Sequence, residues 1–195
     1  MKTGEQRLNL PFPAPASVCN DITLAKDGTA YISDTPNGRI FRVRPHTRSL
    51  ELFVEDEQLK GIDGIVFSGD GTLYVNSVTS NRLWRIAIDR NGHVGAITQL
   101  TPSQPLQGAD GFRLVRGNVF LLAENAAGRL DEVHISGKRA MITVIKEGLD
   151  TPTSAIALGH TIYGVERKIE FVNNPELKGK DPGPFKIFTL PLPPP

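Results

Sequence analysis

The chain has 195 residues, of which 39% are hydrophobic and 22% charged, a composition typical of one globular domain with a substantial core. Its 22 basic and 21 acidic residues give a net charge of +1 without any run of like charge, which disfavours nucleic acid as a partner because a phosphate-binding surface needs clustered Lys and Arg. No stretch approaches 18 consecutive apolar residues, so the sequence predicts no membrane span and no membrane partner.

The first residues of the sequence do not resemble a secretory signal peptide. The segment Met1–Gln6 lacks the apolar core of a secretory signal peptide, and the lone Cys19 excludes an internal disulfide. Both features favour the cytoplasm, and a signal peptide encoded upstream of Met1 would change that expectation.

In chain order, the first predicted element is a turn and an outer strand at residues 3–12. Four copies of one pattern follow: a polar opening, an apolar strand, a Gly turn and a second strand led by an aromatic residue. The copies open at Asn20, Asp63, Asp110 and Thr153, which are 43, 47 and 43 residues apart. This period is typical of β-propeller blades.

Each copy is predicted to form one four-stranded antiparallel blade, because short apolar runs alternate with turn residues. In the second copy we expect strands at 63–67, 72–77, 82–88 and 96–100. The sequence therefore predicts an all-β, single-domain propeller with blades at approximately 17–58, 59–107, 108–150 and 151–192. The alternative is an irregular β-sandwich, since sandwiches also contain short, regularly spaced strands.

Two accounts of the ring remain open. The segment 3–12 is interpreted as the outer strand of a preceding blade whose inner strands are not in the sequence. The four blades are then two thirds of a six-bladed ring, which we favour, or the N-terminal strand closes a four-bladed ring.

Polar residues recur where each inner strand opens. Since the hairpin brings the end of the second strand beside the start of the first, we expect a group of polar side chains at one end of the assembly, comprising Asn20, Asp34, Asp63, Asn76, Ser77, Asp110, Glu124, Asn125, Ser154 and Glu166. Carboxylate and carboxamide oxygens are the hard ligands that Ca²⁺ prefers. Asn20, Asp63 and Asp110 are the candidate metal ligands, and the competing interpretation is that they cap strand starts.

Other reactive side chains have structural explanations. The histidines His46, His93, His134 and His160 lie in or beside turns or on a strand with polar neighbours, and we expect them to face solvent. We expect Cys19 to be a packed core thiol. Trp84 and the repeated aromatics Tyr31, Tyr74, Phe120 and Tyr163 are expected in the core.

The chain resembles the senescence-marker-protein/gluconolactonase family, relatives of regucalcin. The residues that carry the resemblance are Asn20-Asp21-Ile22 with 27–34, Gly61–Ile65 with 70–75, and Ala109-Asp110-Gly111, and the ending at 149–154, 165–166 and 184–186 is also similar. The resemblance implies a six-bladed ring that holds one divalent cation, Ca²⁺ foremost and Zn²⁺ or Mn²⁺ otherwise, and hydrolyses sugar lactones.

Within this resemblance, Asn20 matches the asparagine of the family's third blade. Asp110 matches the fifth-blade aspartate that touches the metal and transfers a proton, so it is the implied catalytic residue. Asp63 stands where relatives commonly have asparagine. The family's first-blade glutamate has no counterpart, which agrees with an N-terminally incomplete member.

The predicted function is therefore divalent-metal-dependent hydrolysis of a sugar or related lactone. The sequence contains no Gly-x-Ser-x-Gly nucleophile turn, no His-x-x-x-His pair and no phosphate-binding Gly loop that would favour other chemistry. The alternative is a non-catalytic propeller that binds a small molecule or a protein, with activity lost if the N-terminal blades are absent. A strictosidine-synthase-like propeller would need a channel glutamate and an aromatic pocket, which the sequence does not reveal.

Overall fold

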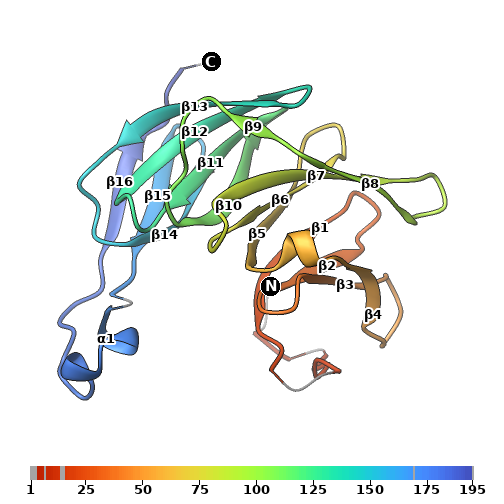
Figure 1. The fold of residues 1–195 in the computed structure, drawn as a ribbon, viewed down its shortest axis with the longest axis horizontal. Coiled ribbons are helices and arrows are strands. Elements are labelled where there is room, and N and C mark those ends of the chain that lie inside the picture. Colours follow the sequence, from red (N-terminus) through yellow and green to blue (C-terminus); the bar gives the residue numbers. More distant parts are fainter. Residues whose placement is uncertain (1–3, 7, 14–15, 169, 195) are drawn as a thin grey trace.

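The computed structural model describes residues 4–6, 8–13, 16–168 and 170–194. The fold is all-β, with four antiparallel sheets arranged as the blades of a β-propeller and only short helical turns (Figure 1), which confirms the predicted fold class. Blade 1 consists of β1 (Cys19–Leu24), β2 (Ala30–Asp34), β3 (Arg39–Val43) and β4 (Glu51–Glu55). Blade 2 consists of β5 (Ile62–Phe67), β6 (Leu73–Ser77), β7 (Arg82–Ile88) and β8 (Val94–Gln99), close to the strands expected there.

The last two blades follow the same order with two differences. Blade 3 consists of β10 (Ala109–Arg116), β11 (Val119–Glu124), β12 (Arg129–Ser136) and β13 (Arg139–Lys146), and the short β9 (Thr101–Pro102) pairs in parallel with β13. Blade 4 has three strands, β14 (Pro152–Leu158), β15 (Thr161–Glu166) and β16 (Ile187–Pro191). Its β15–β16 connection contains the helix α1 (Glu170–Asn173) and the 3₁₀ turn η2 (Pro175–Leu177), and a further 3₁₀ turn, η1 (Glu57–Leu59), connects blades 1 and 2.

The hairpins between first and second strands explain the repeated Asp-Gly. Gly28 and Gly71 have φ angles of 86° and 90°, a conformation that side chains disfavour. The preceding aspartates accept hydrogen bonds from backbone amides two residues on, at 2.9 Å from Thr29 N to Asp27 Oδ1 and 3.0 Å from Thr72 N to Asp70 Oδ1. Each Asp-Gly therefore fixes a tight turn and the register of its hairpin.

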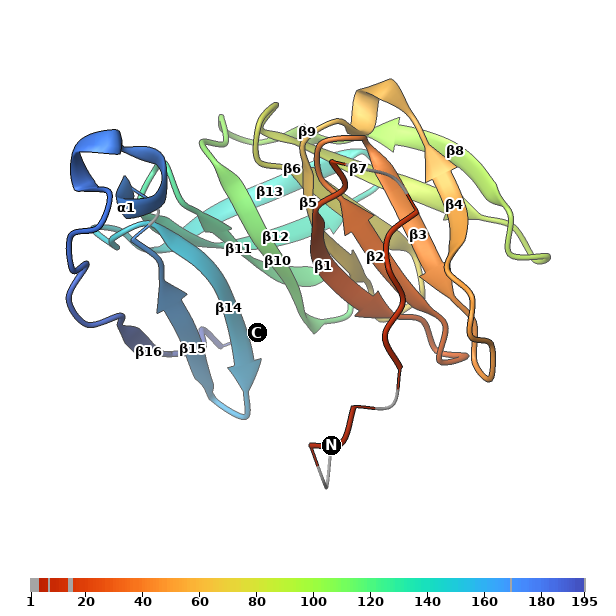
Figure 2. The ribbon, with the colours of Figure 1, turned by 90° about the horizontal axis from the view of Figure 1, so that it is seen from below.

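The blades follow one another in a row through their first strands. β1 packs beside β5, β5 beside β10 and β10 beside β14, so these four are the inner strands. Blades 1 and 4 lie at opposite ends of the row (Figure 2). Among the described residues, β1 and β14 do not pack along each other as the successive inner strands do.

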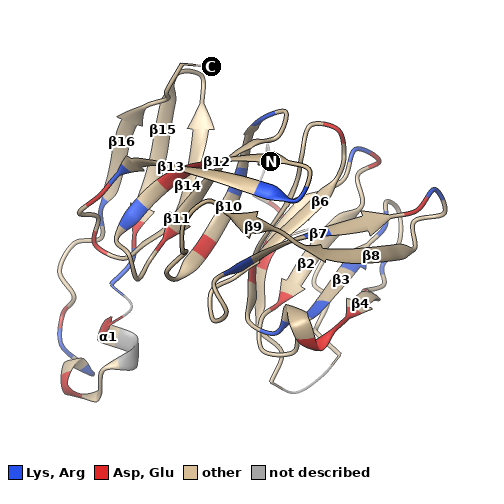
Figure 3. Ribbon diagram, turned by 45° about the horizontal axis from the view of Figure 1, so that its top comes forward, with Lys and Arg blue, Asp and Glu red and all other residues tan. Residues whose placement is uncertain are grey.

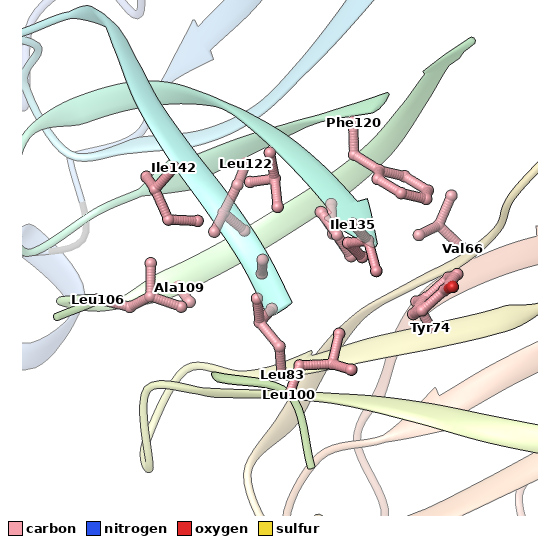
Figure 4. Close-up of a cluster of buried hydrophobic side chains, with 13 residues drawn as sticks. Val66, Tyr74, Leu83, Leu100, Leu106, Ala109, Phe120, Leu122, Ile135 and Ile142 are labelled. Atoms are coloured by element: carbon pink, nitrogen blue, oxygen red, sulfur yellow. The ribbon is translucent and has the colours of Figure 1, made fainter. Parts of the chain in front are cut away.

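The core lies between neighbouring blades rather than within one blade. Figure 4 shows the cluster between blades 2 and 3, where Val66 and Tyr74 meet Phe120 and Ile135. Tyr74 and Phe120 make an edge contact with ring centroids 5.5 Å apart. A second cluster between blades 1 and 2 contains Trp84, which is fully buried. The stacking of blades thus buries the apolar faces that a single sheet would expose.

The outer faces of the two end blades remain exposed. On blade 1, Ile22 and Leu24 are exposed, and on blade 4 Leu158, Tyr163 and Ile187 are exposed. The expectation that Tyr163 belongs to the core was wrong, because no further blade of this chain packs on its side of blade 4.

The N-terminal segment runs alongside blade 1. Phe12 contacts Phe41 of β3 edge to face, with ring centroids 4.9 Å apart. The described residues 4–6 and 8–12 of the segment predicted as an outer strand form no strand. Its assignment to a preceding blade stays a prediction.

Charged residues occur in all four blades and their loops, with both signs interspersed (Figure 3). Among the described residues, no helix has the length and hydropathy needed to cross a bilayer.

Candidate functional site

The candidate site lies where the inner strands begin, and a recurring irregularity of the sheet forms it. In blades 1 to 3 the pairing of the inner strand shifts by one residue, between Cys19 and Ile22, Ile62 and Ile65, and Ala109 and Phe112. Such a bulge redirects side chains at the end of a sheet. The three residues inside these bulges that were predicted as ligands, Asn20, Asp63 and Asp110, are called the inner-strand cluster below.

The structure brings members of the inner-strand cluster into contact. Asn20 Nδ2 donates to Asp63 Oδ2 at 2.9 Å, across blades 1 and 2, and to Thr35 Oγ1 of its own blade at 3.0 Å. Asp63 and Asp110 interact through their side chains across blades 2 and 3. Asn125 Nδ2 donates to Asp110 Oδ2 at 2.9 Å. Three neighbouring blades therefore contribute oxygen-bearing side chains to one place.

Residues on second strands fix the backbone of the cluster. Ser33 Oγ donates to the Asp63 carbonyl at 2.8 Å, and Asn76 Nδ2 donates to the Asp110 carbonyl at 2.7 Å. Ser33 and Asn76 are both fully buried and occupy equivalent positions, 43 residues apart. Each blade thus holds the site residue of the next blade in place.

Burial and proximity disfavour charge on both aspartates. Burial, then the charge of Asp110, raises the pKa of Asp63 to about 7, and the hydrogen bond from Asn20 opposes this increase. Burial also raises the pKa of Asp110, against the hydrogen bond from Asn125. The pair of aspartates therefore favours keeping a proton near neutral pH.

The positively charged side chain of Arg167 acts on Asp63 and Asp110 from a distance. Arg167 directly follows β15, and its backbone N donates to Thr151 O at 3.0 Å, so it lies at the end of blade 4 where β14 begins. Its positive charge lowers the pKa of both Asp63 and Asp110. Arg167 is a residue that sequence reasoning missed, since a lone arginine after a strand carries no signal.

The other polar residues predicted at this end include three carboxylates that bind the backbone of the entering loops. Strand pairing places Asp34, Ser77, Glu124 and Glu166 opposite the starts of the inner strands, as expected. The carboxylates bind backbone amides of the entering loops: Asp34 accepts from Val18 N, Glu124 from Gln107 N and Glu166 from Asp150 N. These three carboxylates therefore hold the chain where it enters each blade.

Of the residues given structural explanations, all but two behave as predicted. The side chains of His46, His93, His134 and His160 are exposed, and Tyr31, Tyr74, Trp84 and Phe120 are buried. Cys19 is exposed, so the prediction of a core thiol was wrong. It opens β1, the strand of the row that no preceding blade of this chain covers.

Two further residues near the cluster were not predicted. Asp21 follows Asn20 and forms an ion pair with Arg113, which lies three residues after Asp110. Because 92 residues separate them, the contact could not be predicted from the sequence, although both residues differ from their equivalents in the other blades.

The described residues bear on metal binding in one further way. Among them, no group of three or more His, Cys, Asp and Glu side chains is arranged to hold a metal ion. The inner-strand cluster has two carboxylates and one carboxamide, so its assignment as a cation site remains a prediction.

Comparisons with known proteins identify the fold. No family model and no curated protein sequence matches the chain. Among solved structures, a gluconolactonase from Xanthomonas campestris is similar with a TM-score of 0.67 and 18% identity over 94% of this chain and 61% of that one. Virginiamycin B lyase from Staphylococcus aureus is similar with a TM-score of 0.64 and 20% identity over 78% of this chain and 50% of that one. A luciferin-regenerating enzyme also has a TM-score of 0.64, with 11% identity over 77% of this chain and 54% of that one.

These similarities establish a propeller fold that proteins of different activity share. The chain spans between 50% and 61% of the length of these three structures. Gluconolactonases are among the structural neighbours, in agreement with the resemblance seen in the sequence, and so are lyases. The activity must therefore be argued from the site.

Proposed function

We propose that the inner-strand cluster binds one divalent cation and supports hydrolysis of a sugar or related lactone, as in the senescence-marker-protein/gluconolactonase family. The observation that carries the proposal is the meeting of the buried Asp63 and the half-buried Asp110, carboxylates from neighbouring blades, with the carboxamides of Asn20 and Asn125. The structural likeness to a gluconolactonase supports the substrate class.

The donor set fits a hard cation. Two carboxylates and the Asn20 carboxamide offer oxygens, which Ca²⁺ prefers and Zn²⁺ or Mn²⁺ also accept. A cation would relieve the electrostatic cost that raises the pKa of Asp63 to about 7. Ca²⁺ takes about 6–8 oxygens, so water and substrate would complete the shell around Asn20, Asp63 and Asp110.

The chemistry needs one group that moves a proton. Asp110 is the proposed catalytic residue: its carboxylate accepts a proton from the attacking water and returns it to the leaving alkoxide oxygen when the lactone ring opens. Asn125 holds Asp110 by the 2.9 Å hydrogen bond and so orients the reacting oxygen. A bound cation would polarise the lactone carbonyl and lower the pKa of the water.

The test compares lactone hydrolysis with and without metal. Chelator-treated protein is assayed on glucono-δ-lactone and on a longer acyl lactone, before and after adding Ca²⁺, Zn²⁺ or Mn²⁺. We expect metal-dependent turnover that falls by roughly 10²–10⁴-fold in Asp110→Asn, the usual range for loss of a general base. Glu147→Gln, an exposed carboxylate on the β13–β14 connection, is the matched control and should retain activity.

The outcomes separate the two predicted functions. Metal-dependent turnover lost only in Asp110→Asn supports the lactonase. Cation binding without turnover on either substrate would favour the non-catalytic propeller that binds a small molecule or a protein.

A further inference from the structure

A partly buried ion pair crosses between blades beneath the inner-strand cluster. Arg113 Nη1 lies 2.5 Å from Asp21 Oδ2 and Arg113 Nη2 lies 2.7 Å from Asp21 Oδ1, so the guanidinium and the carboxylate form a bidentate ion pair. Asp21 is 8% exposed and the Arg113 side chain 31%. The pair joins β1 of blade 1 directly to β10 of blade 3.

Asp21 also binds the blade between them. Ile65 N of β5 donates to Asp21 Oδ2 at 3.0 Å, and Ile22 N donates to Asp21 Oδ1 at 2.8 Å. One carboxylate thus ties together β1, β5 and β10, the three strands that carry the inner-strand cluster. With two donors on each oxygen, Asp21 has no free lone pair directed at a cation and is not itself a ligand.

Both members of the pair depart from the repeat. Asp21 stands where blades 2 and 3 have Gly64 and Gly111. A Cβ at Gly64 would lie 2.4 Å from Asn76 Oδ1, and one at Gly111 would lie 2.4 Å from Thr153 O. The blade architecture therefore excludes a side chain at this position in blades 2 and 3, whereas blade 1 makes room for a carboxylate.

Arg113 is equally unusual. It stands where blades 1 and 2 have Thr23 and Val66, so the blade architecture does not require a long cationic side chain there. Since Asp21 and Arg113 both differ from their repeat equivalents and contact each other, we infer a role specific to this end of the molecule.

We propose that Asp21 and Arg113 are positioning residues that fix the spacing of Asn20, Asp63 and Asp110 across three blades. This proposal builds on the proposed function, because the spacing matters for cation binding. Ligand groups must be held to within roughly 0.5 Å to define a site, and these three belong to separate sheets. The bidentate pair resists sliding of one blade against another because its two hydrogen bonds break together.

The first experiment measures spacing in metal-free protein. Cys19 is the only cysteine and is exposed beside Asn20, and Ala126→Cys adds an exposed thiol on the β11–β12 turn of blade 3. Spin labels on both report the distance across the cluster by pulsed electron paramagnetic resonance. We expect Arg113→Met to widen the distance distribution at least about twofold.

The matched control breaks another arginine contact between blades. Arg42 donates to Gly92 O at 2.5 Å, linking blades 1 and 2 away from the cluster, and its side chain is 11% exposed. Arg42→Met should leave the distance distribution unchanged. An unchanged distribution in Arg113→Met, or equal widening in Arg42→Met, would overturn the proposal.

The second experiment measures Ca²⁺ affinity by calorimetry. We expect Arg113→Met to weaken Ca²⁺ binding at least about tenfold and Arg113→Lys, which keeps one charged donor, to recover part of the loss. If the original protein binds no Ca²⁺, Zn²⁺ or Mn²⁺, the proposed function fails while the spin-label result still decides the positioning role. Arg113→Lys also serves the distance measurement if Arg113→Met does not fold, with intermediate widening expected.

Discussion

Two groups of acidic side chains in this molecule differ in whether an arginine pairs with them. In the inner-strand cluster, Asp63 and Asp110 meet without any arginine or lysine in ion-pair contact among the described residues. In the rim cluster of blade 3, defined as Glu124, Arg129 and Asp131, both acids are fully buried and share one arginine, with Arg129 Nη2 2.6 Å from Glu124 Oε1 and Nε 3.3 Å from Asp131 Oδ2.

The difference separates architecture from function. Blade 1 repeats the rim arrangement at equivalent positions, with Arg39 Nη2 2.8 Å from Asp34 Oδ2. A buried acid that forms an ion pair with an arginine of its own blade has a structural role that needs no ligand. The Asp63–Asp110 pair has no arginine or lysine in ion-pair contact among the described residues, which supports the proposed cation site, and this contrast can be tested.

The largest expected effect comes from removing the rim counter-ion. Arg129→Met leaves Glu124 and Asp131 buried without a cation, which typically costs about 3–5 kcal/mol. Urea denaturation should show this loss in the free energy of unfolding. A loss below 1 kcal/mol would mean that the rim cluster tolerates unpaired acids, and the contrast with the inner-strand cluster would fail.

The opposite response is expected from supplying a cation at the inner-strand cluster. Calcium at about 100 times its dissociation constant should stabilise the protein by about 2.7 kcal/mol, because it binds the folded state alone. Asp63→Ala, which removes the ligand oxygen, should abolish this gain, and Glu147→Gln should keep it. Thermal unfolding with and without Ca²⁺ measures the effect, and equal stabilisation of all three proteins would place the cation elsewhere.

The pH dependence of stability sharpens the contrast further. The pKa of Asp63 is about 7 in the folded protein and about 4 in an unfolded chain, so folding favours the protonated form. Its stabilising contribution is complete below about pH 4 and is lost as pH rises to about 7. Between pH 5 and 8 we expect metal-free protein to lose roughly 2–3 kcal/mol more than Asp63→Asn.

Calcium should reverse the sign of this difference, because it binds the ionised carboxylates. Asp131, whose pKa is raised to about 8 by burial and then by Glu124, contributes a second decline that is common to both proteins. Identical pH profiles for Asp63→Asn and the original protein would contradict the assignment.

The smallest effect is expected at Cys19. Its thiol is exposed, so Cys19→Ser should change the free energy of unfolding by no more than about 0.5 kcal/mol. A larger loss in urea denaturation would restore the core interpretation of this residue.

Sequence reasoning succeeded where the information is local and repeated. Asp27-Gly28 and Asp70-Gly71 indicate hairpins whose geometry depends on adjacent residues, so the blades and their strands could be predicted. The common end of Asn20, Asp63 and Asp110 followed from the same periodicity.

Contacts between blades could not be predicted in this way. The Asp21–Arg113 pair depends on how blades 1 and 3 are placed relative to each other. The exposure of Cys19 and Tyr163 depends on whether another blade packs against blades 1 and 4. Neither is encoded in the period of one repeat. The departures from the repeat, such as Asp21 in place of glycine, are the signal that could have directed attention to this contact.

The bulge at the start of each inner strand has a consequence for how this chemistry can change. Because β1, β5 and β10 each present one group from an otherwise self-contained hairpin, a single codon in one blade alters one donor and leaves the neighbouring ladders intact. Selection or design can therefore exchange asparagine and aspartate one blade at a time, and because Asn20 Nδ2 donates to Asp63 Oδ2, each exchange also alters the hydrogen bonding and charge that the neighbouring blade meets.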